Sequence, residues 1–284
     1  MAKGPMWMIL ATLAFTGMVT LVKIGRVELG YGPLELMVWR ALAGIPLVWA
    51  LTGMAVRVHR VDLMLLRCLF GFGAMFSFFS AARGLGVGEL SVIVKLQPIL
   101  VAMLAPLALG SGERSDRRVV GALLLGMAGT VALLWPDLRE ARLSAHVGAA
   151  MWAVSAACCS SVAHTTLRAL GPTEDSRVVV FWFQLATGAG ALLLLPVEGG
   201  MHLPPAPWAW ATVLGVGVFA ALGQLLMTRA YQVERAARVA AASYAAPLFG
   251  FLSDVVFFGN TPGPHALFGT VLVLCGGALV LRRA

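Results

Sequence analysis

The segment AARGLGVGELSVIVKLQPILVAMLAPLALGSGE, residues 81–113, decides the fold. A glycine-rich polar turn separates one long apolar segment from a second, and the second contains Lys95, Gln97 and Pro98 in its interior. An ionisable residue at membrane depth usually faces the protein interior or a water-filled cavity, because lipid does not solvate its charge. The proline removes one helical hydrogen bond and frees the carbonyl of Val94 as an acceptor at the same level. We interpret this segment as one wall of a polar cavity inside a membrane.

The composition places the whole chain in a membrane. Of the 284 residues, 60% are hydrophobic and only 12% are charged, whereas about a quarter of the residues in a soluble domain are charged. The net charge of +8 comes from Lys and Arg residues in short pieces between apolar runs, without a basic patch interleaved with aromatic residues. Orientation in the bilayer explains this charge better than nucleic-acid binding, so no nucleic-acid partner is expected.

Ten apolar segments reach the length of about 20 residues that a bilayer requires. They are residues 6–24, 34–52, 63–85, 88–109, 118–136, 146–170, 178–195, 208–231, 236–258 and 264–281. The first is long enough to span and is expected to stay in place rather than be cleaved. With the N-terminus in the cytoplasm, most Lys and Arg residues fall on the cytoplasmic side. We predict an all-α, multi-pass protein of the cell (inner) membrane with both termini in the cytoplasm.

The second half of the chain repeats the first. When Pro98 is aligned with Pro247, Gly110 falls on Gly259, and each apolar segment with a central proline follows a polar turn and precedes a glycine-rich final span. Each unit then contains five spans, an odd number, so the second unit must be inserted upside down relative to the first. Inverted repeats of this kind are typical of transporters that work by alternating access.

These features resemble the drug/metabolite transporter superfamily, and more closely its EamA-type ten-helix branch. The resemblance rests on the five-plus-five arrangement, the proline in the fourth and ninth spans, and the GSGE exit at residues 110–113, and it covers essentially the whole chain. It predicts two inverted repeats, residues 1–143 and 144–284. It also implies a central cavity lined by the first four spans of each repeat, with the fifth spans outside it. The second copy departs from the family pattern, because Pro262 stands near where the exit glutamate usually falls.

Lys95 is the strongest candidate for substrate binding. It lies about seven residues, or roughly 10 Å, into its span, although a lysine side chain can also extend to the membrane interface. In the repeat alignment Lys95 falls on Tyr244. Tyr244 follows Ser243, and Pro247 leaves the carbonyl of Ser243 without its helical hydrogen-bond donor. We expect the lysine and the tyrosine to face one another across the cavity. One would hold an anionic group, and the other would stack or donate a hydrogen bond. Pro98 and Pro247 are the predicted pivots of the gates.

Four further residues are candidates for substrate binding: Arg40, Trp39, Trp182 and Gln97. Arg40 lies inside its span and either binds substrate or forms a structural ion pair, for which Asp254 is the possible partner. The two tryptophans occupy matched places in the repeats, about one turn deeper than an interfacial aromatic belt requires. Gln97 either binds solute or hydrogen-bonds a neighbouring helix.

The leading hypothesis is a secondary active transporter of a small polar metabolite. The deepest charges, Lys95 and Arg40, are positive, whereas Glu35 and Asp254 lie toward the outer edge, so an amino-acid-like zwitterion or an organic anion is favoured. The alternative is an exporter of cationic or amphipathic drugs or metabolites. A membrane-embedded enzyme is a weaker hypothesis, because the sequence contains no GxSxG, HExxH or Walker A motif.

No cofactor or metal site is expected. The four cysteines lie in apolar segments without the spacing of zinc ligands, so packing roles are predicted for them. The expected partners are the small-molecule substrate and membrane lipid. The sequence leaves open whether the protein is a monomer or a homodimer, in which direction it transports and which ion it couples to.

Overall fold

The computed structural model describes residues 3–281 except 54–55, 82–86, 136–146 and 259–262, and the described residues form helices and turns without a β-strand. The α-helices are α1 (Lys3–Leu29), α2 (Pro33–Leu51), α3 (Val61–Ala81), α4 (Val87–Val94), α5 (Gln97–Leu109), α6 (Arg117–Leu133), α8 (Val147–Leu170), α9 (Ser176–Leu194), α10 (Pro207–Val233), α11 (Ala236–Ala242), α12 (Ala245–Phe258) and α13 (Pro264–Leu281). Short 3-10 helices are η1 (Ser111–Glu113) and η3 (Leu195–Glu198).

Seven helical stretches among the described residues are long and apolar enough to cross a membrane. They are Lys3–Arg26, Pro33–Leu51, Val61–Phe78, Val92–Leu109, Val147–Leu170, Ser176–Glu198 and Pro207–Val233. The other three predicted spans correspond to α6, which has 17 residues, to the interrupted pair α11 and α12, and to α13. The predicted all-α membrane fold is therefore confirmed. Helix α13 coincides with the predicted span 264–281, α6 is slightly shorter than its predicted span, and the spans at 88–109 and 236–258 are each interrupted.

Two of the predicted spans are each broken in the middle. Helix α4 ends at Val94 and α5 begins at Gln97, while α11 ends at Ala242 and α12 begins at Ala245. Both breaks fall just before the prolines at positions 98 and 247. A proline lacks a backbone N–H, and its ring clashes with the carbonyl four residues earlier, so the helix cannot continue regularly there. The predicted positions of the breaks agree with the structure.

The order of helices α1–α6 recurs in α8–α13, and equivalent helices of the two repeats make equivalent contacts. Helix α1 packs on α10 as α8 packs on α3, and α10 packs on α2 as α3 packs on α9. Arg177 at the start of α9 donates to the carbonyl of Leu51 at the end of α2 (2.8 Å). The backbone N–H of Leu34 at the start of α2 donates to Glu198, which follows α9 (2.8 Å). The equivalent helices α2 and α9 are therefore antiparallel, which confirms the inverted repeat.

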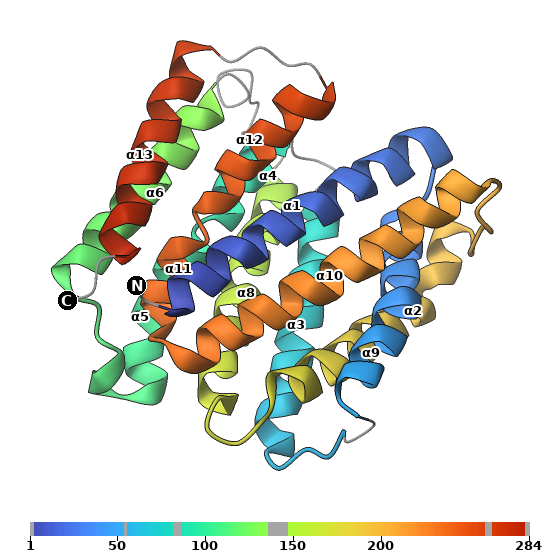
Figure 1. The fold of residues 1–284 in the computed structure, drawn as a ribbon, viewed down its shortest axis with the longest axis horizontal. Coiled ribbons are helices and arrows are strands. Elements are labelled where there is room, and N and C mark those ends of the chain that lie inside the picture. Colours follow the sequence, from blue (N-terminus) through green and yellow to red (C-terminus); the bar gives the residue numbers. More distant parts are fainter. Residues whose placement is uncertain (1–2, 54–55, 82–86, 136–146, 259–262, 282–284) are drawn as a thin grey trace.

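Helices α6 and α13 pair at one edge of the molecule, far from α2 and α9 at the opposite edge (Figure 1). Glycines allow this pair to pack backbone against backbone. A Cβ on Gly129 would lie 2.9 Å from the carbonyl oxygen of Gly269, and a Cβ on Gly269 would lie 2.8 Å from that of Gly129. Small residues that permit close approach are typical of helix pairs in membranes. The glycine-rich final spans thus form the periphery, and the other helices surround the centre.

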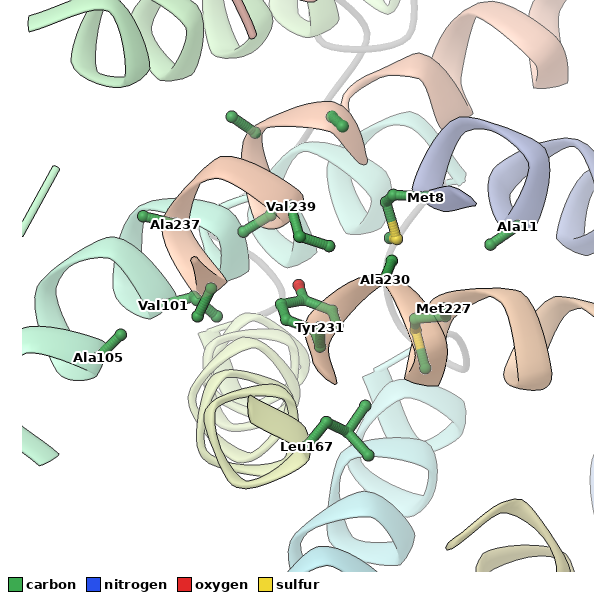
Figure 2. Packing of buried hydrophobic residues seen from close by; sticks show 14 of the residues in the cluster. Met8, Ala11, Val101, Ala105, Leu167, Met227, Ala230, Tyr231, Ala237 and Val239 are labelled. Carbon is green, nitrogen blue, oxygen red and sulfur yellow. The ribbon is translucent and has the colours of Figure 1, made fainter. Parts of the chain in front are cut away.

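The largest cluster of buried apolar residues lies where helices of both repeats meet. Figure 2 shows Tyr231 of α10 with Val239 of α11 on one side and Leu167 of α8 on the other, and all three side chains are fully enclosed. Met8 of α1 completes the cluster on the α10 side. This packing brings the break between α11 and α12 close to the break between α4 and α5, since α11 lies on α5.

Candidate functional site

The two helix breaks are joined by a reciprocal pair of hydrogen bonds. The Lys95 ammonium donates to the carbonyl of Ser243 (3.2 Å), and the Tyr244 hydroxyl donates to the carbonyl of Lys95 (2.9 Å). Lys95 and Tyr244 are therefore in contact, and the carbonyl of Ser243 is in use as an acceptor. Each side chain reaches a backbone carbonyl at the other helix break, Lys95 that of Ser243 and Tyr244 that of Lys95, whereas we expected the two side chains to face one another across a cavity. The lysine side chain bonds inside the protein instead of extending to the interface.

Helix α6 makes room for this junction. A Cβ on Gly126 would overlap the ring of Tyr244, so only glycine allows the aromatic ring to lie against α6 at this point. Tyr244 and Ser243 are both buried, whereas Lys95 is half-buried. The junction therefore holds a half-buried ammonium group whose described acceptor is a neutral carbonyl.

A second cluster contains two buried arginines around one aromatic ring. The guanidinium carbons of Arg67 and Arg40 lie 3.8 and 5.9 Å from the ring centroid of Phe183. Arg40 donates to the side-chain oxygen of Gln184 (3.3 Å), and Arg67 donates to that of Gln224 (3.3 Å). Among the side chains that the structure describes, no carboxylate pairs with either guanidinium. Helices α2, α3, α9 and α10 contribute these residues.

The alternative partner of Arg40, Asp254, has a side chain outside the described ones. The described contacts of Arg40 are to Gln184 and to the sulfur of Met75 (3.4 Å). Arg67 is the residue of this cluster that the sequence argument missed. The available signal was a charged residue two turns inside an apolar helix that begins at Val61.

Two glycines provide the space for this cluster. A Cβ on Gly71 would overlap Arg67 and lie 2.5 Å from the ring of Phe183. A Cβ on Gly44 would overlap the side-chain amide of Gln184. The backbone of α2 and α3 thus forms a cradle that any larger residue would fill.

Hydrogen-bond donors are in surplus around both clusters. In the described part of the chain, the buried side-chain nitrogens without a partner are Trp39 Nε1, Arg40 Nη2, Arg67 Nε, Gln97 Nε2, Gln184 Nε2 and His164 Nδ1. All but the histidine nitrogen act only as donors. The other unpartnered buried atoms there are hydroxyl oxygens, which donate or accept. A buried donor without an acceptor is costly, so an acceptor-rich ligand would complete this region.

Helices α8 and α10 contribute a stacked pair of rings. The rings of His164 and Tyr231 are 5.1 Å apart and nearly parallel, at 20°. The ammonium is held at the junction of the broken helices and the guanidinium groups by α2, α3, α9 and α10, so the two positive groups form separate poles of the polar region.

The two predicted tryptophans lie at opposite ends of the molecule. Trp39 packs edge-on against Trp210, with ring centroids 5.4 Å apart. Trp182 donates its indole N–H to the carbonyl of Val56, in the connection between α2 and α3 (2.8 Å). They are matched in the repeat, as predicted, but an inverted repeat places matched residues at opposite ends. Their role in substrate binding stays a prediction.

At both ends of the molecule, buried carboxylates fasten one repeat to the other through partners that the sequence did not predict. Glu174 accepts the backbone N–H groups of His59 and Arg60 (both 2.6 Å). At the other end, Glu35 accepts the backbone N–H of His202 (2.5 Å). Each contact joins one repeat to the other. A sequence pattern does not find them, because they depend on the path of a connecting segment.

The comparisons with known proteins agree with this architecture. A model of the EamA-like transporter family matches residues 2–135 and 147–282. The pseudopaline exporter CntI of Pseudomonas aeruginosa is 26% identical, over 96% of this chain and 93% of that protein. The aromatic amino acid exporter YddG of Ancylobacter novellus is 28% identical, over 75% of this chain and 73% of its own.

More distant similarity extends to eukaryotes and to solved structures. Human solute carrier family 35 member G1 is 22% identical over 84% of this chain and 67% of its own length. A solved structure titled "Crystal structure of protein" superposes with a TM-score of 0.77 over 95% of each chain at 22% identity, and this supports the fold alone. The resemblance first indicated by residues 81–113 is confirmed, since the family match extends over both repeats. The chain therefore belongs to the EamA-like transporter family.

Proposed function

We propose that the protein is a secondary transporter of small polar metabolites that carry an anionic group, either amino-acid-like zwitterions or organic anions. The single observation that carries this proposal is the Lys95 ammonium, held between two helix breaks and bonded to the neutral carbonyl of Ser243 (3.2 Å). A hydrogen bond between two charged groups is stronger than one to a neutral acceptor. A substrate carboxylate is therefore a better partner for this ammonium than the carbonyl.

This exchange of partners links substrate binding to movement. The bonds between Lys95 and Ser243 and between Tyr244 and Lys95 hold the broken helix of the first repeat to that of the second. A substrate that takes over the ammonium loosens that connection, and a ligand shifts a conformational equilibrium through such differences in contact. Broken helices at the repeat interface are where transporters of this type bind substrate and alternate their access. The names of two relatives, an exporter of pseudopaline and one of aromatic amino acids, add support.

The test is binding to the purified full-length protein in detergent. Metabolite classes are screened by thermal shift, because a ligand that binds only the folded state raises the melting temperature. The dissociation constant of the strongest hit is then measured for the parent and for Lys95→Met. We expect Lys95→Met to weaken binding about ten- to a hundredfold, the range for loss of a charged hydrogen bond. Lys95→Arg should rescue binding only in part, because a planar fork replaces a compact charge.

The matched control is Arg60→Met, which removes an exposed arginine paired with Asp62 at the start of α3. It should bind the hit as the parent does. If Lys95→Met also binds as tightly as the parent, the lysine is a structural residue and the preference for anionic groups loses its support. Tighter binding of cationic amphipathic compounds by Lys95→Met than by the parent would instead favour the alternative, export of cations.

A further inference from the structure

We propose that Arg40 and Arg67 form a second anion-binding subsite, so that the substrate carries at least two separate carboxylate groups. This inference rests on the proposed function and narrows its substrate class. It concerns a pole of the polar region other than Lys95. The cluster of Arg40, Arg67, Phe183, Gln184 and Gln224 is called the arginine pair site below.

The burial of the two guanidinium groups is the first support. Arg40 is 6% exposed and Arg67 is 2% exposed. Buried arginines are normally paired with carboxylates, because removing a charge from water is costly. Within the described residues these two arginines contact amide oxygens, a thioether and an aromatic face, none of which carries a negative charge. Among the described side chains, these two neighbouring positive charges thus have no counter-charge.

The number of unpartnered donors is the second support. Arg40 Nη2, Arg67 Nε and Gln184 Nε2 are buried and have no described partner. A guanidinium donates to a carboxylate through two parallel N–H groups, and a carboxylate offers about four acceptor positions. Stacking on Phe183 holds a guanidinium by its face and leaves the N–H groups at its edge available. One carboxylate offers enough acceptor positions for all three donors.

The separation of the poles indicates two carboxylates instead of one. The Lys95 ammonium is bonded at the junction of the broken helices, whereas the arginine pair site is built by α2, α3, α9 and α10. Because different elements hold the two positive groups, a separate carboxylate is assigned to each. An elongated molecule with a carboxylate at each end reaches both.

The experiment uses small aliphatic acids as probes on the full-length protein in detergent, at constant ionic strength and pH. Butyrate carries one carboxylate, succinate and glutarate carry two, and tricarballylate carries three. The half-amide of glutarate has the length of the diacid and one charge fewer. We expect the di- and tricarboxylates to bind about ten- to a hundredfold more tightly than butyrate and the half-amide.

The variants assign this preference to the arginines. Arg40→Gln and Arg67→Gln should bind glutarate only as tightly as butyrate, so that the preference for the dicarboxylate is lost. Arg67→Lys keeps the charge and should retain part of the preference, which provides a readout if the glutamine variant does not fold. Arg177→Gln removes an exposed arginine at the start of α9 and is the matched control, expected to keep the full preference.

Several results would overturn the inference: equal binding of mono- and dicarboxylates by the parent, no binding of any acid in the series, or an intact preference in both glutamine variants. Its failure is distinguishable from that of the proposed function. If butyrate binding depends on Lys95 while glutarate has no advantage, only the arginine pair site is wrong. If the arginine variants lose the preference while Lys95→Met binds butyrate normally, only the role of Lys95 is wrong.

Discussion

At the scale of single residues, Glu113 explains the GSGE exit of the fourth span. Its carboxylate accepts from the guanidinium of Arg168 (2.8 Å) and from the backbone N–H of Ala236 at the start of α11 (2.8 Å). Gly110 turns the chain from α5 into η1 at φ 95°, a conformation that residues with a Cβ rarely adopt. The turn at Gly110 thus directs Glu113 across the interface between the repeats, where its carboxylate caps helix α11 of the second repeat.

Loss of this carboxylate should destabilise the protein. Glu113→Ala leaves a partly buried arginine and a helix N-terminus without their acceptor, so we expect the free energy of unfolding to fall by about 2–4 kcal/mol. Glu113→Gln keeps one acceptor and should lie between this variant and the parent. The measurement is ligand-free thermal or denaturant unfolding in detergent.

The control for Glu113 is Asp62→Ala, which removes the exposed ion pair with Arg60. Exposed pairs contribute little because water and salt screen them. A melting temperature for Glu113→Ala as high as that of Asp62→Ala would contradict the bridging role of the glutamate.

Some residues of the candidate site could be predicted from the sequence, and others could not. The pairing of Lys95 with Tyr244 could be predicted, because the repeat alignment placed them at equivalent positions on two helices with the same break. Arg67 could not, because a charge near the predicted end of a span looks interfacial until the face of the helix is known. Trp182 bonds the carbonyl of Val56, and that partner depends on the path of a connection that hydropathy does not describe.

At the scale of elements, the sequence located the apolar segments and both breaks, but not the helix ends. The predicted span 6–24 is part of a helix from Lys3 to Leu29, since polar residues continue a helix beyond the apolar stretch. Helix starts depend on side-chain caps, as where Asp116 accepts the backbone N–H of Val119 (2.8 Å). The prolines were informative because their effect on a helix is local and needs no tertiary contact.

The prolines at the breaks should matter more for transport than for folding. Pro98→Ala and Pro247→Ala restore a backbone N–H and allow the helices to continue through the breaks, so we expect altered transport rates with little change in melting temperature. Transport is measured in proteoliposomes with the ligand found by the thermal-shift screen. Pro106→Ala is the matched control, because Pro106 lies inside the continuous part of α5. Unchanged rates in both break variants would count against a gating role for the prolines.

At the scale of the whole molecule, the inverted repeat produces matched fastenings at opposite ends. The ring of His59 lies 3.5 Å from the Glu174 carboxylate, and the ring of His202 lies 3.3 Å from that of Glu35. Each histidine precedes the third helix of one repeat, and each glutamate lies at the start of the second helix of the other. Both ends are fastened in this structure, whereas the alternating access expected from the inverted repeat would require them to open in turn. The symmetry thus places an equivalent contact between a histidine and a glutamate at each end.

The charges of the two ends give the orientation in the membrane. Arg57, Arg60 and Arg177 are exposed at the end fastened by Glu174, and connections rich in Lys and Arg remain in the cytoplasm. That end is therefore predicted to be cytoplasmic. The end that contains Glu198 is predicted to lie outside.

Single-cysteine labelling tests this orientation. The background is a variant without the four free cysteines, Cys68, Cys158, Cys159 and Cys275. Arg57→Cys and Arg177→Cys report on one end. On the other, Leu203→Cys is preferable to Glu198→Cys, because Leu203 is 75% exposed whereas the Glu198 carboxylate accepts the N–H of Leu34. A membrane-impermeant maleimide should label Leu203→Cys in intact cells and the two arginine variants only after the membrane is opened. Labelling of Leu203→Cys only from the cytoplasmic side would show that the topology is the reverse of the predicted one. The fold would then stand, but each end would face the opposite compartment.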